Sequence, residues 1–276
     1  PSALSRHVRL LEDQLGTLLF VRTTRHVALT NDGAAFIEEA RALLLRADSL
    51  AERFRARGRN RAGALKVGVM DTAAAGLMPM LLKDLKNQGS RIAVELLEDK
   101  TIRLLPRLLS GRLHLVIGRP PAEADRRIDR LFLFHESAVV AVPARHRLAA
   151  RSQITIADLA HEPMILPDRR ARPHSHDLTI KLFEMAGFTP TIAQVAEEKQ
   201  TIVNLVAARL GVAIVPRWTA RMAVPGVRYL KLRQPKGQTV DMLPLAAMWL
   251  RGSADSARDE VVALLRTRMN CYGRTA

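Results

Sequence analysis

Residues 1–33 read PSALSRHVRLLEDQLGTLLFVRTTRHVALTNDG, and their pattern predicts a helix followed by a hairpin. Apolar residues recur at spacings of four, three and four, namely Leu4, Val8, Leu11 and Leu15. This single apolar stripe predicts an amphipathic helix over residues 2–15, with Gly16 as a suitable C-cap. Two β-prone apolar pieces then flank the basic, threonine-rich residues 22–26, which predicts a hairpin over residues 18–30.

The polar side of this helix has the residue types that read DNA. It lies away from the leucines and carries Ser2, Ser5, Arg6 and Arg9. Hydroxyl groups can reach base edges, and an arginine can bind O6 and N7 of guanine. The tip of the hairpin adds Arg22, Thr24 and Arg25, which suit contacts with phosphates or the minor groove. The alternative is an ordinary solvated helix face.

A long helix is predicted over residues 31–58. Thr30 or Asn31 can cap it, and Asp32 in its first turn complements the helix dipole. Its apolar residues form a heptad seam: Phe36, Ala40, Leu43, Ala47, Leu50 and Phe54. A buried amphipathic helix would also show a stripe, but this length and the polar flanks favour a helix that pairs with a partner helix. Five arginines between residues 53 and 61 then mark a linker.

Residues 61–276 alternate predicted strands with predicted helices. Strands are expected at residues 65–70, 92–97, 113–117, 137–143, 164–166, 191–195, 212–215 and 240–250. Helices are expected at residues 76–86, 175–186, 201–209 and 253–268, with a further helix that begins near Leu104, because Pro106 fits a helix start. Such alternation indicates βαβ units and parallel sheets. Two such sets predict a two-lobed ligand-binding domain with crossover strands.

Residues 1–33 resemble the LysR-type transcriptional regulators. That family's pattern is approximately A-L-S-R-x-[IV]-x-x-L-E-x-x-L-G-x-x-L-F-x-R, followed by L-T-x-x-G. The chain matches it nearly position for position, with Ala3-Leu4-Ser5-Arg6, Leu11-Glu12, Leu15-Gly16, Leu19-Phe20, Arg22, Leu29-Thr30 and Gly33. The later order of elements agrees, so the resemblance covers essentially the whole chain.

The resemblance implies the fold class and its domains. We expect a multidomain chain with a partial winged helix-turn-helix, a long linker helix, and an α/β effector domain with two subdomains like those of periplasmic binding proteins. The DNA-binding part would span residues 1–30, the dimerisation helix residues 31–60 and the effector domain residues 61–276. Subdomain I would take about 61–140 and 243–276, and subdomain II about 141–242.

The resemblance also implies how the chain meets DNA. It places residue 1 at the start of the recognition helix, with the family's first two helices before it, so we expect this chain by itself to bind DNA weakly. Family contacts with DNA fall at positions that match Pro1, Ser2, Ser5, Arg6 and Arg25. The expected partners are double-stranded DNA, a small effector, a second copy in a homodimer, further copies in a homotetramer, and RNA polymerase.

Composition agrees with such a protein. Lys and Arg number 43 against 27 Asp and Glu, a net charge of +16, which favours polyanionic partners or anionic ligands. No stretch approaches about 18 uninterrupted apolar residues, so we expect no membrane contact. The one cysteine, Cys271, cannot form an internal disulfide or a Cys-rich metal site, which favours the cytoplasm.

An effector site is expected where parallel strands end, because ligands bind at the carboxyl ends of strands in open α/β sheets. Asp71 and Thr72 follow one predicted strand, and Lys100 and Thr101 follow another. Related regulators of aromatic catabolism contact a carboxylate effector through hydroxyl residues at positions that match Thr72 and Thr101. Helix capping is the alternative role for each threonine.

A basic loop between a predicted strand and a predicted helix adds further candidates. It carries Arg169, Arg170, Arg172 and His174. Arginines there suit an anionic ligand through charge-assisted hydrogen bonds, and the resemblance implies that effector contacts also come from this loop. The alternative is an exposed basic loop without a ligand. Gln200 and Thr201, at the start of the next helix, are a weaker pair.

Other classes of protein fit less well. The eight histidines show no established metal-ligand spacing, and the sequence has no nucleophile elbow and no glycine-rich phosphate loop. We therefore expect no enzyme activity, no metal and no cofactor. A solute-binding protein of a transport system would share the two-lobed domain, but it would not need the basic helix, the hairpin and the heptad seam of residues 2–58.

Overall fold

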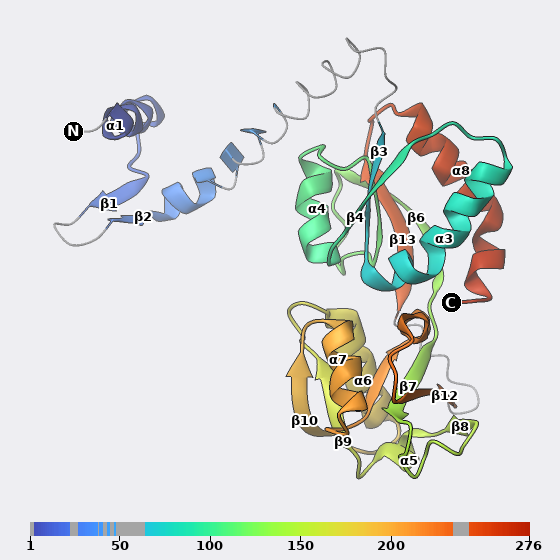
Figure 1. Cartoon of the computed structure of the whole chain (residues 1–276). Coiled ribbons are helices and arrows are strands. Elements are labelled where there is room, and N and C mark those ends of the chain that lie inside the picture. Colours follow the sequence, from blue (N-terminus) through green and yellow to red (C-terminus); the bar gives the residue numbers. More distant parts are fainter. Residues whose placement is uncertain are drawn as a thin grey trace. The chain divides into compact units, whose positions relative to one another are not determined.

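The computed structural model describes residues 3–22, 27–37, 39–40, 43–44, 47, 64–233 and 243–276. The chain divides into two compact units, which are residues 1–63 with 109–112, and residues 64–108 with 113–276. The first unit contains the predicted DNA-reading helix and hairpin. The second contains the predicted two-lobed domain (Figure 1).

The N-terminal unit begins with α1 (Ala3–Leu15), which ends at Gly16 with a φ of +68°. Strands β1 (Phe20–Arg22) and β2 (Val27–Leu29) pair antiparallel and confirm the predicted hairpin. The buried side chain of Glu12 joins helix to hairpin, because its Oε1 accepts hydrogen bonds from the N–H groups of Leu19 and Phe20 at 2.8 and 3.0 Å. Residues 31–37 are helical, and Thr30 Oγ1 caps them by accepting from Gly33 N at 2.8 Å.

The first lobe is built on a five-stranded sheet in the order β4-β3-β5-β13-β6. Its strands are β3 (Leu65–Val69), β4 (Val94–Glu98), β5 (Leu115–Gly118), β6 (Ile128–His135) and β13 (Pro244–Leu250). Helices α3 (Asp71–Asn87) and α8 (Ser256–Gly273) cover one face, and α4 (Thr101–Leu109) covers the other (Figure 1). Strand β3 pairs parallel with β4 and β5, while β13 pairs antiparallel with β5 and β6.

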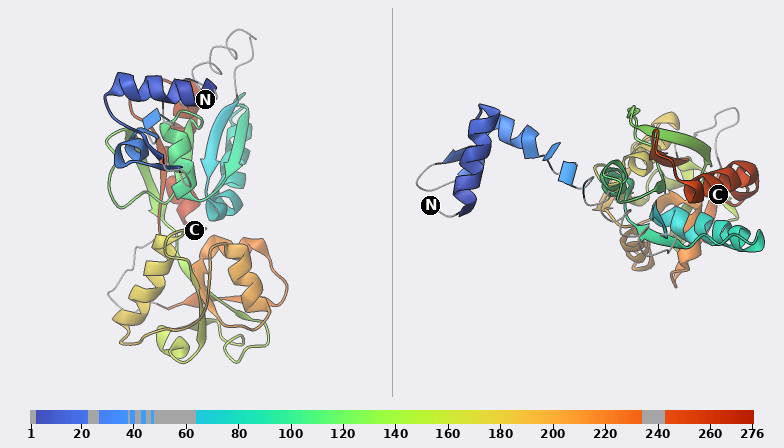
Figure 2. Two further views of the ribbon diagram at one scale, coloured as in Figure 1. Left: turned by 90° about the vertical axis from the view of Figure 1, so that its left-hand side faces the viewer. Right: turned by 90° about the horizontal axis from the view of Figure 1, so that it is seen from above.

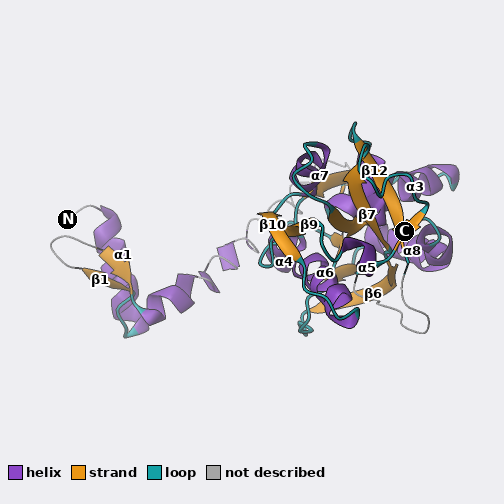
Figure 3. Cartoon of the chain, turned by 90° about the horizontal axis from the view of Figure 1, so that it is seen from below, coloured by secondary structure: helices purple, strands orange, loops and turns teal. Residues whose placement is uncertain are grey.

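The second lobe has two linked groups of strands. A sheet of order β11-β7-β12-β8 lies beside the parallel pair β10-β9, and a bridge between Met164 and Val212 joins them. The strands are β7 (Ala138–Pro143), β8 (Gln153–Ile154), β9 (Pro163–Pro167), β10 (Thr191–Ala196), β11 (Ala213–Pro216) and β12 (Val227–Leu232). Helices α5 (Ile156–Leu159) and α6 (Pro173–Met185) pack on one face and α7 (Lys199–Ala207) on the other (Figures 2 and 3).

Near the crossover between the lobes, a tryptophan from a second-lobe segment is buried in the core of the first lobe. The short 3-10 helix η1 (Arg217–Met222) follows β11 of the second lobe, yet Trp218 is buried in the apolar core of the first lobe. Its ring meets Phe134 edge-on at 5.7 Å. A side chain at Gly76 of α3 would overlap this ring, so glycine is required at that position. The lobes are therefore joined by packing as well as by backbone.

Some predicted boundaries were wrong. Helix α3 begins at Asp71, directly after β3, rather than at residue 76. Helix α4 begins at Thr101 rather than near Leu104, with Pro106 inside the helix, where the ring removes one N–H donor. Strand β7 starts at Ala138 in the second sheet, within the range assigned to subdomain I. No helix in the described parts of the chain is long and apolar enough to cross a membrane.

Candidate functional site

A pocket of about 340 Å³ lies between the two lobes. Its walls come from the starts of α4 and α6, the segment after β5, and single residues at the starts of α3 and α7. It is lined by Met70, Lys100, Thr101, Ile102, Leu105, Arg119, Pro120, Pro121, Ala122, Ala171, Arg172, Pro173, His174, Ser175, Asp177 and Lys199. The lining therefore combines an apolar surface with several cationic side chains.

The topology explains why four helices begin at this pocket. Strands β3, β4, β9 and β10 are each followed closely by α3, α4, α6 and α7, and the carboxyl ends of paired parallel strands lie at the same edge. A helix N-terminus carries partial positive charge and exposed N–H groups. Helices α4, α6 and α7 have no acidic residue in their first turns, whereas α3 has Asp71. The backbone thus favours negative charge at this place.

Asp71 of the first lobe meets two buried cations of the second lobe. Its carboxylate lies 2.9 Å from Arg172 Nη2, and Lys199 Nζ donates to both carboxylate oxygens at 3.0 and 3.1 Å. Burial raises the pKa of Asp71, but the charges of Lys199 and Arg172 outweigh burial and hold the pKa at about 2, below the usual 3.8. Burial lowers the pKa of Lys199 to about 8, although the charge of Asp71 raises it.

A second ion-pair group joins the lobes beside the first. Lys100 of the first lobe contacts Glu197 Oε2 at 2.5 Å and Glu198 Oε1 at 2.6 Å. Burial lowers the pKa of Lys100, but its hydrogen bonds to these two glutamates raise it above 10.5 overall. Arg172 Nη2 also reaches Glu198 at 3.1 Å, so the two groups form one continuous chain of charges. We call this set the interlobe charge chain: Lys199, Asp71, Arg172, Glu198, Lys100 and Glu197.

Glu136 lies at the crossover between the lobes and holds the pocket residue Arg119 in place. Its fully buried carboxylate accepts from Arg119 Nη2 at 2.6 Å, from Thr72 Oγ1 at 3.2 Å and from Trp218 N at 2.9 Å. Arg119 Nη1 donates to the carbonyl oxygens of Leu243 and Pro244 at 2.6 and 3.0 Å. The charge of Arg119 is therefore neutralised within the protein.

The structure brings some of the predicted effector residues together and separates others. Lys100, Thr101, Arg172 and His174 line the pocket. Thr101 Oγ1 accepts from Arg119 N at 3.2 Å, and His174 Nε2 lies 3.0 Å from the carbonyl oxygen of Pro120.

The other four predicted effector residues do not line the pocket. Asp71 pairs with Arg172 and Lys199, and Thr72 is buried against Glu136. Arg169 and Arg170 are exposed, and Arg169 Nε lies 3.3 Å from Asp177 Oδ1.

Four residues of this site were not predicted from the sequence: Arg119, Lys199, Glu197 and Glu198. Three of these follow β10 directly, at the carboxyl end of a parallel strand. The rule that selected Asp71 and Lys100 in the first lobe would have selected them in the second. Arg119 has a similar position after β5, but its role depends on the distant Glu136, which nothing local in the sequence indicates.

The predicted DNA-reading residues are described only in part. Ser5, Arg6 and Arg9 lie on α1, and both arginines are exposed. Arg22 ends β1, and nothing is described of its side chain. Pro1, Ser2, Thr24 and Arg25 lie outside the described residues.

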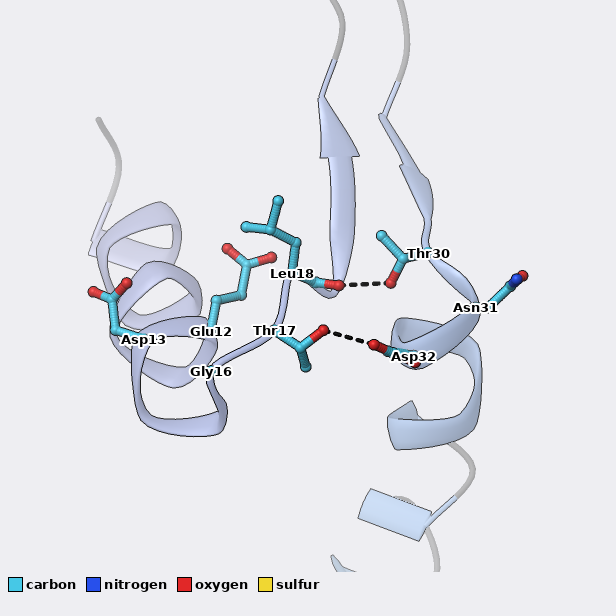
Figure 4. A pocket seen from close by; sticks show the side chains of 8 residues that line it. All are labelled: Glu12, Asp13, Gly16, Thr17, Leu18, Thr30, Asn31 and Asp32. Carbon is cyan, nitrogen blue, oxygen red and sulfur yellow. Dashed lines mark hydrogen bonds between the residues drawn. The ribbon is translucent and has the colours of Figure 1, made fainter.

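A hollow of about 850 Å³ lies at the other end of α1 (Figure 4). Its lining is acidic and polar: Glu12, Asp13, Gly16, Thr17, Leu18, Thr30, Asn31 and Asp32. Thr17 Oγ1 donates to Asp32 at 2.6 Å, and Thr30 Oγ1 donates to the carbonyl oxygen of Leu18 at 2.7 Å. The carboxylates of this hollow repel phosphates.

The heptad seam leaves apolar side chains in water. In the part of the helix that is described, Leu43 is 67% and Leu44 66% exposed. Leu50 and Phe54 of the predicted seam lie outside the described residues. No group of histidine, cysteine, aspartate and glutamate residues within the described ranges has a geometry that could hold a metal ion.

The sequence matches two family models that together cover most of the chain. Residues 1–34 match the model described as "Bacterial regulatory helix-turn-helix protein, lysR family", and residues 58–270 match "LysR substrate binding domain". The chain is 50% identical over 276 residues to the HTH-type transcriptional regulator TtuA of Agrobacterium vitis, covering 100% of this chain and 91% of that protein. It is 33% identical to CatR of Pseudomonas putida, covering 83% of this chain and 78% of CatR.

Solved structures show the same architecture. The LysR family transcriptional regulator CbnR superposes with a TM-score of 0.71 at 25% identity, covering 96% of this chain and 89% of CbnR. Full-length CbnR complexed with its target DNA also gives a TM-score of 0.71, at 26% identity, covering 96% and 88% of the two chains. The effector-binding domain of BenM with its effector benzoate gives a TM-score of 0.63 at 24% identity, over 77% of this chain and 95% of that domain.

Proposed function

Because this chain belongs to the LysR family of bacterial transcriptional regulators, we propose that a small anionic effector binds in the pocket between its lobes and thereby controls its action on DNA. One observation carries this proposal: four helix N-termini begin around a 340 Å³ pocket that also holds cationic side chains. A ligand there touches both lobes, so it favours one arrangement of the lobes over others.

We assign the effector contacts to residues that line the pocket. Thr101 and the backbone N–H groups at the start of α4 can donate hydrogen bonds to a carboxylate, as can His174 at the start of α6. Ile102, Leu105 and Pro120 supply an apolar wall for the body of the ligand. An anionic group attached to a compact apolar body fits this combination best.

We assign the reading of DNA to α1. Ser5, Arg6 and Arg9 offer hydroxyl and guanidinium groups to base edges, and the structure of CbnR with its target DNA is a solved example of a family member on DNA. Pro1, Ser2, Arg22, Thr24 and Arg25 are further proposed contacts, on the residue types and positions in the sequence. Residues 1–30 would form this module, and the protein would act in the cytoplasm.

We propose that residues 31–60 dimerise the chain, because Leu43 and Leu44 expose apolar surface that a partner helix would cover. Tetramers would form through the effector domains. Two edge strands of these domains expose apolar side chains, at Leu96 of β4 and at Ile192 and Val195 of β10. The relatives are regulators, and we propose no catalytic activity and no transport function for this chain.

A thermal-shift screen of the whole chain tests the effector proposal. The panel pairs each carboxylate with its neutral amide: aromatic acids, dicarboxylates, amino acids and sugar acids. A ligand at ~100 times its dissociation constant adds about 2.7 kcal/mol of stability. A carboxylate that stabilises the chain while its amide does not, and that loses this effect in Thr101→Val, supports the site.

The matched control replaces Thr155, which caps α5 in the second lobe, by valine. Thr155→Val should lower the unfolding temperature but leave the shift caused by the ligand intact. The proposal is wrong if amides stabilise the chain as well as their acids do, or if Thr101→Val and Thr155→Val have equal effects on the ligand-induced shift.

A further inference from the structure

Asp71 has an unusual position for a residue of the first lobe. Its carboxylate is held by the two cations that the second lobe presents at the pocket, Arg172 at 2.9 Å and Lys199 at 3.0 and 3.1 Å. Both cations line the pocket, whereas Asp71, which contacts them, does not. The position beside Arg172 and Lys199, which favours an anion, is therefore already occupied by a carboxylate of the protein itself.

Resting on the function proposed above, we propose that Asp71 is a resident carboxylate, which holds the lobes together through Arg172 and Lys199 until the carboxylate of an effector replaces it. Asp71 then determines both the resting arrangement of the lobes and the affinity for the effector. The ligand class that follows is a carboxylate able to bind two cations at once, because Asp71 uses both of its oxygens.

The competition has a simple physical basis. Arg172 and Lys199 are nearly fully buried, so each pays for lost hydration and each needs a compensating negative charge. The charges of Lys199 and Arg172 keep the pKa of Asp71 at about 2 against the effect of burial, so Asp71 is ionised at neutral pH. An incoming carboxylate must therefore displace an existing anion, and its observed affinity is reduced by the strength of that contact.

A local contact within α3 is the alternative role for Asp71. Asp71 is the first residue of α3, after the N-cap Met70, and its Oδ1 accepts a hydrogen bond from Thr72 N at 2.7 Å. The side-chain oxygen of asparagine can accept the same hydrogen bond, but asparagine carries no charge. Asp71→Asn therefore keeps this contact and the shape while it removes the negative charge.

The decisive experiment uses acetate, which has the size and charge of the aspartate side chain. Unfolding of Asp71→Ala is measured against sodium acetate, with sodium chloride keeping the ionic strength constant. We expect acetate to stabilise Asp71→Ala with an apparent affinity about tenfold or more above its affinity for the wild-type chain. Hydrogen exchange at residues 99–105 and 171–177, on the two sides of the pocket, should be faster in the variant and should slow again with acetate.

Asp125→Ala is the matched control. Asp125 also accepts from a backbone N–H, that of Arg127 at 2.8 Å, and also pairs with an arginine, but its partner Arg127 lies two residues away in the same lobe. Acetate should give Asp125→Ala no stabilisation beyond that of chloride. Equal effects of acetate on both variants, or no specific effect on Asp71→Ala, would overturn the proposal.

A second variant covers the case in which Asp71→Ala does not fold. Asp71→Asn retains the size of the side chain and its contact with Thr72 N, so it should fold, show faster exchange on both sides of the pocket and bind carboxylates more tightly than the wild-type chain. Unchanged exchange and unchanged affinity in Asp71→Asn would overturn the proposal. If acetate rescued Asp71→Ala while no carboxylate of the panel stabilised the wild-type chain, the anionic effector would be excluded and the role of Asp71 in holding the lobes would stand.

Discussion

The Glu136 carboxylate lies 2.6 Å from Arg119 Nη2, and the two side chains are 0% and 6% exposed. Glu136 stands at the crossover between the lobes, and Arg119 lines the pocket. A buried ion pair contributes little net stability when intact, but removing one charge leaves the other without compensation. This pair therefore connects the pocket to the crossover, and a substitution that removes either charge should destabilise the fold.

We expect Glu136→Gln to lower the free energy of unfolding by about 3–5 kcal/mol, because the Arg119 charge would be left buried and unpaired. Urea unfolding monitored by circular dichroism measures this loss. Asp129→Asn is the control, since it breaks the exposed pair between Asp129 and Arg251, whose distance is 2.8 Å, and such pairs contribute about 0–1 kcal/mol. If the free energy of unfolding fell by similar amounts in the two variants, the buried pair would contribute no more to stability than the exposed pair.

Lys199 should give the unfolding free energy a distinct pH dependence. Burial lowers its pKa from 10.5 to about 8, against the charge of Asp71 and together with those of Arg172 and Arg119. Between these two values the unfolded chain binds the proton more strongly than the folded chain. The contribution of Lys199 to stability therefore increases as the pH rises from about 8 to about 10.5.

The measurement compares the wild-type chain with Lys199→Arg across this range of pH. Because arginine stays protonated, the variant should lack the increase, and the difference should grow by at least about 1 kcal/mol toward high pH. Lys83→Arg, at an exposed position of α3, should follow the wild-type curve. Parallel curves for the wild-type chain and Lys199→Arg would contradict the burial of the Lys199 ammonium group.

Leu43→Glu should weaken the dimer. Leu43 is 67% exposed in the single chain, and a charge on the seam would have to be buried against the partner helix. Sedimentation of the variant should show a smaller assembly, while its thermal shift with an effector stays unchanged. Glu39→Gln alters a charge at an exposed position of the same helix and should leave the assembly intact. An unchanged mass for Leu43→Glu would exclude this seam as the dimer contact.

Local sequence patterns predicted those helices and strands whose residues show a regular spacing of apolar side chains. The leucine spacing of residues 4–15 gave α1, and alternating strands and helices gave the two-lobed domain. Strands β6 and β12 were missed, because charged and apolar residues mix along them. Helix α4 was placed too late because Pro106 is accommodated inside the helix.

The candidate site was predicted less completely than the fold. Position after a strand selected Lys100, Thr101, Arg172 and His174, which do line the pocket. The same rule also selected Arg169 and Arg170, which are exposed, because sequence does not show which arginine of a loop turns inward. The partners of Asp71 are 101 and 128 positions away, so no local pattern could indicate that its charge is compensated.

The interlobe charge chain has three positive and three negative members, so its charges cancel. A group of charges with no net charge attracts distant ions only weakly. Its attraction becomes strong only for a molecule that has already entered the pocket and fits it. Chloride, phosphate and the other abundant anions of a cell would therefore be poor triggers despite their concentrations. We expect such a regulator to be insensitive to the common ions of the cell and to respond to the shape of its ligand.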